Sequence, residues 1–205
     1  MDVRQTVRQS LALEAAALQR LAEQAGEQYE QAVELIRRAT GKVVVVGIGK
    51  SGHVGRKIAA SLSSTGTPAF FVHAAESVHG DSGMIEARDV VILLSNSGET
   101  AEVLNALAIV KRIGAPRIAI TKNAQSTLAL GSDVALTYGY EKEADHLGLA
   151  PTTSALLQLA IGDALAVALC ELKQFTNADF HLYHPGGSLG KQLAADVSTK
   201  EEQGA

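Results

Sequence analysis

Three hydroxyl side chains stand close together in the segment VILLSNSGET. Ser95, Ser97 and Thr100 follow an apolar run typical of a buried strand, and they surround Asn96 and Gly98 just before a predicted helix. Hydroxyls and backbone N–H groups at the start of a helix can donate hydrogen bonds to the oxygens of a phosphate without bringing a full positive charge. An ordinary helix cap requires one hydroxyl, so three within six residues favour a phosphate-binding turn.

The turn GIGKSG is a second candidate for anion binding, and it also follows an apolar, strand-like run. A glycine-rich turn that starts a helix directs free N–H groups and the positive end of the helix dipole toward a ligand. Gly49, Lys50 and Ser51 are therefore predicted to contact the substrate. The alternatives are an exposed Lys50 and a Ser51 that caps its own helix.

The three glycines of this turn match the spacing of a dinucleotide-binding loop, but other parts of that pattern are missing. Such a loop needs an acidic residue at the end of the next strand to hold a ribose, and the chain has Val72 and His73 there. A triphosphate-binding loop would need glycine where the chain has Val44. A phosphate of another kind is thus favoured over a dinucleotide and over a purely structural turn.

The composition of the 205-residue chain indicates a packed globular protein, since 46% of its residues are hydrophobic and 20% are charged. Its net charge is −4 with scattered basic residues, which argues against nucleic acid or a membrane surface as a partner.

The apolar stretch 155–170 contains Gln158 and Asp163, and we expect it to be a helix buried in protein rather than a membrane span, with Asp163 buried and hydrogen-bonded or at a subunit contact. The one cysteine, Cys170, is expected to be a buried thiol. This thiol and the lack of a signal-peptide pattern predict a cytoplasmic protein.

The spacing of apolar residues predicts a single α/β domain over residues 1–197, followed by a disordered tail over 198–205. Helical periodicity runs from about 3 to 40, with Gly26 as a break between two helices. Strands and helices alternate over 41–197, which indicates a doubly wound, mostly parallel five-stranded sheet flanked by helices, with ligands bound beyond the carboxyl ends of its strands. The expected strands are 43–46, 69–72, 90–94, 117–120 and 134–137, and the expected helices are 53–64, a short one near 75, 101–113 and 154–172.

The two turns and four further segments together resemble the SIS (sugar isomerase) family, whose members bind phosphosugars. The likeness covers roughly residues 10–195 and is greatest to the arabinose 5-phosphate isomerase group. It implies the SIS fold and an isomerase that interconverts ribulose 5-phosphate and arabinose 5-phosphate through an enediol, supplying the Kdo sugar of lipopolysaccharide without a cofactor. SNSGET alone identifies only the fold, whereas HLGLAPTTS with HPGGSLG is more specific. The four further segments are ESVHGD (76–81), EKEADHLGLAPTTS (141–154), GDALAVAL (162–169) and HPGGSLGKQL (184–193).

The chain departs from this group in two places. Longer members carry a pair of cystathionine-β-synthase-type regulatory modules after the isomerase domain, whereas this chain ends at Ala205. It is expected to be either a short form without that regulation or an excised fragment. The usual Cys–Pro before LGLAPTTS is replaced by Asp145 and His146, which alters the loop and removes a thiol that could bind metal.

Aldose–ketose isomerisation moves a proton between C1 and C2, so it needs a base, an acid at the carbonyl oxygen and help in opening the cyclic aldose. Glu143, in a loop beyond the fifth predicted strand, is the first choice as base, and a solvated loop carboxylate is the alternative. Glu102, in the first turn of the helix after SNSGET, is an alternate base or orients the base. Its other interpretation is an ordinary helix-start residue beside a capping Ser97 or Thr100.

The remaining candidates assist these carboxylates. His184 and His79 are expected to open the sugar ring or to shuttle protons near neutral pH, unless they are structural. Lys50 is expected to stabilise the phosphate or a developing oxyanion, and Thr152 and Thr153 to make further substrate contacts. The resemblance also implies that such a histidine comes from a neighbouring subunit, and hence a homotetramer with shared active sites.

A metal site has to be considered because His181 and His184 stand three residues apart and His146 could lie nearby. No HExxH motif or cysteine cluster accompanies them, and an enediol mechanism with a carboxylate base requires no metal. No catalytic metal is therefore expected, although zinc could inhibit by occupying the histidines. His53 and His73 are expected to be structural.

Two alternative functions stay open. A phosphosugar-sensing module would need the hydroxyl turn but no set of proton-transferring side chains, and the chain has carboxylates and histidines as well. An isomerase of sedoheptulose 7-phosphate or a hexulose 6-phosphate is the second alternative, because the hydroxyl turn would recognise only the phosphate.

Overall fold

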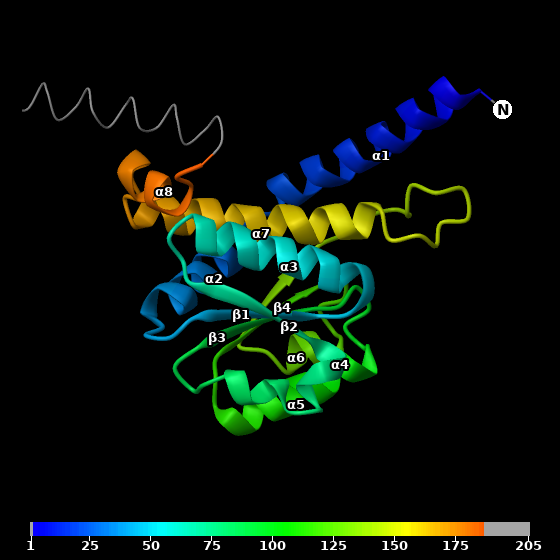
Figure 1. The fold of residues 1–205 in the computed structure, drawn as a ribbon. Helices are drawn as coiled ribbons and strands as arrows, with labels where there is room; N and C mark the ends of the chain where they lie inside the picture. The colour runs from blue at the N-terminus through cyan, green and yellow to red at the C-terminus, as the bar shows by residue number, and fades with distance from the viewer. Residues whose placement is uncertain (1, 187–205) are drawn as a thin grey trace, which may run out of the picture.

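A computed structural model describes residues 2–186 of the chain, and its centre is a parallel sheet of five strands in the order β2-β1-β3-β4-β5 (Figure 1). This confirms the predicted α/β class and all five predicted strands. The strands are β1 (Val43–Gly47), β2 (Ala69–His73), β3 (Val90–Leu94), β4 (Arg117–Thr121) and β5 (Val134–Thr137).

Helices cover both faces of this sheet (Figure 1). The helices α3 and α7 pack on one face, with α1 and α2 against α7, while α4, α5 and α6 lie on the other. The helices are α1 (Val3–Glu23), α2 (Glu27–Arg38), α3 (Gly49–Ser64), α4 (Ala74–Ser77), η1 (a 3₁₀ helix, Asp81–Met84), α5 (Ala101–Ile113), α6 (Thr127–Leu130), α7 (Thr153–Leu172) and α8 (Asn177–Tyr183).

The central strands are apolar at every position because both faces of the sheet are covered. Side chains alternate between the faces of a strand, so Val43 and Val45 of β1 join the core beneath α3 and α7. Val44 and Val46 join the core beneath α5. Two hydrophobic cores, one on each face, therefore hold β1 and β3 rigidly at the middle of the sheet.

The strand order places a topological switch point between β1 and β3. The chain leaves β1 through α3 on one face, and it leaves β3 through α5 on the opposite face. Connections that diverge in this way open a crevice at the carboxyl ends of the two strands, which is where ligands bind in open α/β sheets. Both predicted phosphate-binding turns lie at this crevice.

Some element boundaries differ from the sequence-based expectation. Helix α3 begins at Gly49 rather than near 53, because the residues of the GIGKSG turn themselves form its first turn. Gly26 is confirmed as the break between α1 and α2. The elements η1, α6 and α8 were not predicted, since they have only 4, 4 and 7 residues, too few for a clear period. The predicted tail, and the end of the predicted domain from 187 onward, lie outside the described residues.

Candidate active site

A cavity of about 320 Å³ opens at the switch point. It brings together the turn after β1, the turn after β3 and the first turns of α7, segments that are far apart in the sequence. This volume is at the small end of the range for ligand pockets. The residues that line it are Ile48, Lys50, Ser51, Asn96, Ser97, Thr100, Pro151, Ser154, Ala155 and Gln158.

The hydroxyl turn after β3 has one buried hydroxyl and two that line the cavity. Ser95 is 2% exposed, and its Oγ accepts a hydrogen bond from Gly98 N at 3.0 Å and lies 2.8 Å from Thr100 Oγ1. Ser95 thus shapes the turn, whereas Ser97 and Thr100 line the cavity. Thr100 is the residue before α5 but makes no side-chain cap hydrogen bond. The structure therefore does not show the ordinary helix cap by Thr100. The first N–H groups of α5 are left for a ligand.

Gly98 allows this turn to fold tightly against a neighbouring segment. Its φ is +72°, in the left-handed region that favours glycine. A Cβ atom at this position would lie 2.1 Å from Ser126 Oγ and 2.9 Å from Thr121 Oγ1. Glycine is thus required here by its conformation and by the close approach of the start of α6.

The turn after β1 presents a second helix N-terminus to the same cavity. Ile48 precedes α3 and has no side chain that could cap it, and Gly49 starts the helix with a φ of +59°. Lys50 and Ser51 of the first helical turn line the cavity, and Lys50 is exposed. Two helix dipoles and one ammonium group therefore favour an anion at this point.

Glu143 is 5% exposed and does not itself line this cavity, but it is hydrogen-bonded to Ser154, which does. Its Oε2 accepts hydrogen bonds from Thr152 N (2.9 Å), Thr152 Oγ1 (3.2 Å) and Ser154 N (3.1 Å). Burial by itself would raise the pKa of the Glu143 carboxyl, but hydrogen bonds from Ser154 and Thr152 outweigh burial and lower that pKa. Glu143 is therefore an ionised carboxylate at neutral pH that also holds the N-terminus of α7.

Glu102 is the second carboxylate near the cavity. It lies in the first turn of α5, two residues beyond Thr100, and it is partly exposed. Glu143 is hydrogen-bonded to the start of α7, which covers one face of the sheet, and Glu102 lies in the first turn of α5, which covers the other. Neither carboxylate lines the cavity itself, but each neighbours a residue that does, Glu143 through Ser154 and Glu102 two residues from Thr100.

The structure does not bring the two predicted histidines into the cavity of the same chain. His79 is exposed in the segment after α4. His184 follows α8, where its ring stacks on Phe180 at 4.1 Å between centroids and its Nδ1 lies 3.0 Å from Phe180 O. Helix α8 lies at the far end of α7, and its Tyr183 lines a hollow beside Lys42, which precedes β1 (Figure 1). His184 is therefore near the end of the sheet where the strands begin, whereas the cavity of its own chain lies where they end.

Comparison with known proteins places this geometry in a family. The model of the SIS domain matches residues 35–168. The chain belongs to the SIS domain family.

Relatives of this SIS domain cover nearly all of it. Arabinose 5-phosphate isomerase KdsD of Pseudomonas aeruginosa is 49% identical, with 96% of this chain and 60% of the relative aligned. Arabinose 5-phosphate isomerase KpsF of Escherichia coli O6:H1 is 50% identical, with 94% of this chain and 59% of the relative aligned. The SIS domain thus spans about 60% of the length of these curated relatives.

A solved structure with the same fold extends the comparison. A protein of Escherichia coli CFT073, determined in complex with arabinose 5-phosphate, is 44% identical, with a TM-score of 0.87 over 90% of this chain and 100% of that one. The architecture predicted from the sequence is therefore confirmed by a structural match over 90% of this chain.

The loop before α7 carries the unusual Asp145 and His146. The Asp145 carboxylate accepts hydrogen bonds from the backbone N–H groups of Leu147, Leu149 and Ala150 at 2.8 to 2.9 Å. Although partial desolvation would raise the pKa of Asp145, these hydrogen bonds lower it. Asp145 therefore organises the loop of this SIS domain and presents two exposed leucines at its tip.

Several other predicted residues lie outside the cavity. Thr152 is used within the loop, where its Oγ1 accepts from Ala144 N at 2.8 Å, and Thr153 is fully buried. His146 and His184 lie at opposite ends of α7, a helix about 30 Å long, so they cannot share a metal ion within one chain. Within residues 2–186 no group of three or more potential metal-binding side chains is found.

Residues expected to be structural have mixed outcomes. Asp163 is hydrogen-bonded, as one of the two expectations had it, but it is not buried, because its carboxylate is 41% exposed and forms an ion pair with Lys57 at 2.5 Å. Cys170 is only partly buried. His73 is partly buried, and its ring packs edge-on against Phe71, whereas His53 is exposed.

Sequence reasoning missed a polar network behind the cavity. Gln158 Nε2 donates to Tyr138 OH at 2.8 Å, and Tyr138 OH donates to Asn96 Oδ1 at 3.0 Å. Asn96 Nδ2 in turn donates to Tyr140 OH at 3.0 Å. The signal for this network was Gln158, one of the few polar residues in the mostly apolar sequence of α7, but its tyrosine partners could not be identified without the fold.

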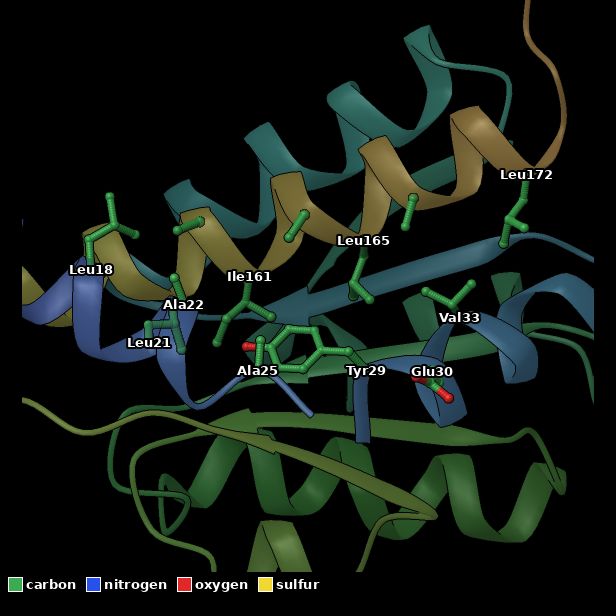
Figure 2. Close-up of a pocket in the computed structure, with 13 residues that line it drawn as sticks. Leu18, Leu21, Ala22, Ala25, Tyr29, Glu30, Val33, Ile161, Leu165 and Leu172 are labelled. Carbon is green, nitrogen blue, oxygen red and sulfur yellow. The ribbon is translucent and has the colours of Figure 1, made fainter. Parts of the chain in front are cut away.

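A second hollow, between α1, α2 and α7, has about 480 Å³ and is almost entirely apolar. Figure 2 shows leucine side chains of α1 and α7 on its walls, with the Tyr29 ring beneath them. It offers no set of groups for phosphate binding, so it is not a candidate for the catalytic site. Its lining is Leu18, Leu21, Ala22, Ala25, Tyr29, Glu30, Val33, Ala160, Ile161, Ala164, Leu165, Ala168 and Leu172.

Proposed function

We propose that this SIS domain is an isomerase that interconverts ribulose 5-phosphate and arabinose 5-phosphate through an enediol, without a cofactor. The observation that carries the proposal is the cavity at the switch point, where two helix N-termini and several hydroxyls meet and where the buried Glu143 carboxylate is hydrogen-bonded to Ser154 of the cavity wall. The names of relatives at 49% and 50% identity, and a similar structure solved with arabinose 5-phosphate, support this substrate.

The phosphate of the substrate binds between the two turns in this proposal. The hydroxyl groups of Ser97 and Thr100 donate hydrogen bonds to the phosphate oxygens, as do the free N–H groups at the start of α5. Ser51 and Lys50 approach from the start of α3. Ser95 supports the turn rather than binding the substrate, since its hydroxyl is buried within it. Gly49 and Gly98 supply the backbone shape.

Glu143 acts as the base that moves the proton between C1 and C2. Its pKa is lowered, so it is ionised and ready to accept a proton at neutral pH. Proton removal generates an enediolate, whose developing negative charge the Lys50 ammonium stabilises. A proton moves from O1 to O2 of the enediolate, and the same carboxyl then returns its proton to the neighbouring carbon, C2. Glu102 orients the substrate, or takes the role of base if Glu143 serves only to hold α7.

A second copy of the chain completes the site. His184 is far from the cavity of its own chain, so we propose that it enters the cavity of a neighbour and, with His79, opens the sugar ring. Helix α7 has 20 residues, one more than the sequence suggested. Its most apolar segment has a mean hydropathy of 1.8, yet only 39% of that segment is buried within the chain. A helix that is apolar on all sides is normally covered.

We therefore propose a cytoplasmic homotetramer in which other copies cover the apolar face of α7. Exposed leucines and valines of α1, the hollow of Figure 2 and α7 together form a continuous surface for this contact. Sedimentation equilibrium gives the test, and a monomer at micromolar concentration would contradict it. In a bacterial cytoplasm the product would supply the synthesis of lipopolysaccharide.

The activity is tested by incubating the purified chain with ribulose 5-phosphate and following the aldose product by proton NMR in deuterium oxide. Exchange of the proton at C2 is expected along with product formation, because the base exchanges its proton with solvent. Glu143→Gln tests the assignment of the base, and Glu141→Gln, an exposed carboxylate in the same loop, is the matched control. Binding of sugar phosphates without turnover would instead indicate a sensing module. Turnover of only a longer sugar phosphate would show that the proposed substrate is wrong and that the chain isomerises that longer sugar.

A further inference from the structure

Gln158 is a buried polar residue in a mostly apolar helix. It lies in the second turn of α7, is 1% exposed, and has the fully buried Leu157 and Ile161 as neighbours along the helix. An amide in such surroundings is unfavourable unless its donor and acceptor groups are hydrogen-bonded. Its hydrogen bonds can therefore be accounted for one by one.

The network behind the cavity determines which way the Gln158 amide points. Burial raises the pKa of Tyr138, so the phenol keeps its single proton. That proton goes to Asn96 Oδ1, which is 3.0 Å away. The Tyr138 oxygen must then accept its hydrogen bond from Gln158 Nε2, which is 2.8 Å away. The amide oxygen of Gln158 is consequently directed away from the tyrosine.

That oxygen, Gln158 Oε1, is buried and has no hydrogen-bond partner in the part of the chain that the structure describes. Gln158 nevertheless lines the cavity, on the same face of α7 as Ser154 and Ala155. The opposite walls carry Lys50 and the hydroxyl turn. An acceptor without a partner, in a side chain that lines a polar cavity, is complementary to a ligand that brings a hydroxyl group.

We propose that Gln158 is a specificity-determining residue whose Oε1 accepts a hydrogen bond from a hydroxyl on the carbon chain of the bound sugar phosphate. This inference rests on the proposed function and adds how the site would recognise the sugar rather than the phosphate. The hydroxyl belongs to a carbon close to the phosphate ester, because Gln158 connects through Tyr138 to Asn96 of the hydroxyl turn. A site that hydrogen-bonds a hydroxyl discriminates against ligands that lack one, since its buried acceptor is then left unpaired.

The test compares two ligands, arabinose 5-phosphate and inorganic phosphate, by isothermal titration with the full chain. Gln158→Leu keeps the approximate size of the side chain but removes the acceptor, and it suits an apolar helix. We expect it to weaken binding of arabinose 5-phosphate about tenfold while binding of inorganic phosphate, which has no sugar hydroxyl, stays unchanged. The value of kcat/KM with ribulose 5-phosphate is expected to fall by a similar factor.

Tyr138→Phe is the control for a purely structural role. It breaks the hydrogen bonds of Tyr138 to both Asn96 and Gln158 but keeps the Gln158 acceptor, so, unlike Gln158→Leu, it is expected to weaken the binding of inorganic phosphate as well as that of arabinose 5-phosphate. The proposal is overturned if Gln158→Leu weakens the binding of both ligands equally, or weakens the binding of neither. If the leucine variant fails to fold, Gln158→Met is measured instead and judged in the same way. If the wild-type chain shows no turnover, the proposed isomerase function fails, while the comparison of the two ligands still decides the role of Gln158.

Discussion

Glu143 is predicted to have two separable roles, as a proton acceptor and as the group that holds the start of α7. Its Oε2 accepts three hydrogen bonds, two of them from the backbone N–H groups of Thr152 and Ser154. In Glu143→Ala both N–H groups lose their partner, and Ser154 is only 1% exposed. Each buried donor without a partner costs about 1–3 kcal/mol, so for two donors we expect the free energy of unfolding to fall by about 2–6 kcal/mol.

Glu143→Gln separates the two roles because the amide still has an oxygen that can accept those hydrogen bonds. It loses the negative charge near the helix N-terminus, an effect of about 0.3–1 kcal/mol, up to about 2 in a partly buried site. We therefore expect a loss of about 1 kcal/mol in stability but a fall in kcat of about 10²–10⁴-fold, the usual contribution of a positioned base. Urea denaturation and the isomerase assay measure the two effects on the same samples.

The pH dependence of stability gives an independent check. The pKa of Glu143 is lowered in the folded chain, so the carboxylate contributes stability above its ordinary pKa. That contribution is lost as the pH falls through the lowered value. The difference in stability between wild type and Glu143→Gln should thus be largest near neutral pH and shrink in acid. A glutamine variant with wild-type turnover would refute the assignment of the base, and an alanine variant of unchanged stability would refute the structural role.

Three further outcomes are expected from the geometry of the turns and the loop. Gly98→Ala should lower the free energy of unfolding by more than about 2 kcal/mol and weaken phosphate binding, because its Cβ would overlap the Ser126 side chain. In contrast, Gly114→Ala, which has a φ of +86° and nothing near its Cβ, should cost only about 1–2 kcal/mol, and equal losses for both variants would contradict the overlap. Thr100→Val should raise KM about tenfold with little change in the urea midpoint, and an unchanged KM would exclude this hydroxyl from the phosphate site. Asp145→Ala should release the loop before α7, seen as faster cleavage there in limited proteolysis; unchanged cleavage would show that the hydrogen bonds to Asp145 do not hold it.

Much of the fold could be predicted from local patterns. The runs VVVV and VVILL are apolar at consecutive positions, which is typical of strands covered on both faces, and this implied a parallel sheet with helices on each side. The glycine-rich and hydroxyl-rich turns followed these strands directly, so their position at the carboxyl edge could also be predicted. Short elements such as α6 and α8 could not, because four to seven residues show no reliable period.

The site could be predicted only in part. Sequence reasoning identified the two turns and Glu143, but not Ser154 and Gln158, whose approach to the cavity depends on how α7 packs across α3. It placed His184 among the catalytic candidates, and only the fold showed that this residue lies near the end of the sheet where the strands begin, away from its own cavity.

The amino-acid sequence by itself determined the family and the alternation of strands and helices, and it predicted that the two turns bind an anion, because these features depend on residues that are neighbours along the chain. Only the tertiary structure decided which hydroxyls line the cavity, which carboxylate is buried, and which amide acceptor is left without a partner. Those properties arise from contacts between segments that are distant in the sequence. Gln158 meets Tyr138 across 20 residues and Tyr138 meets Asn96 across 42, and no local pattern records how such segments pack together.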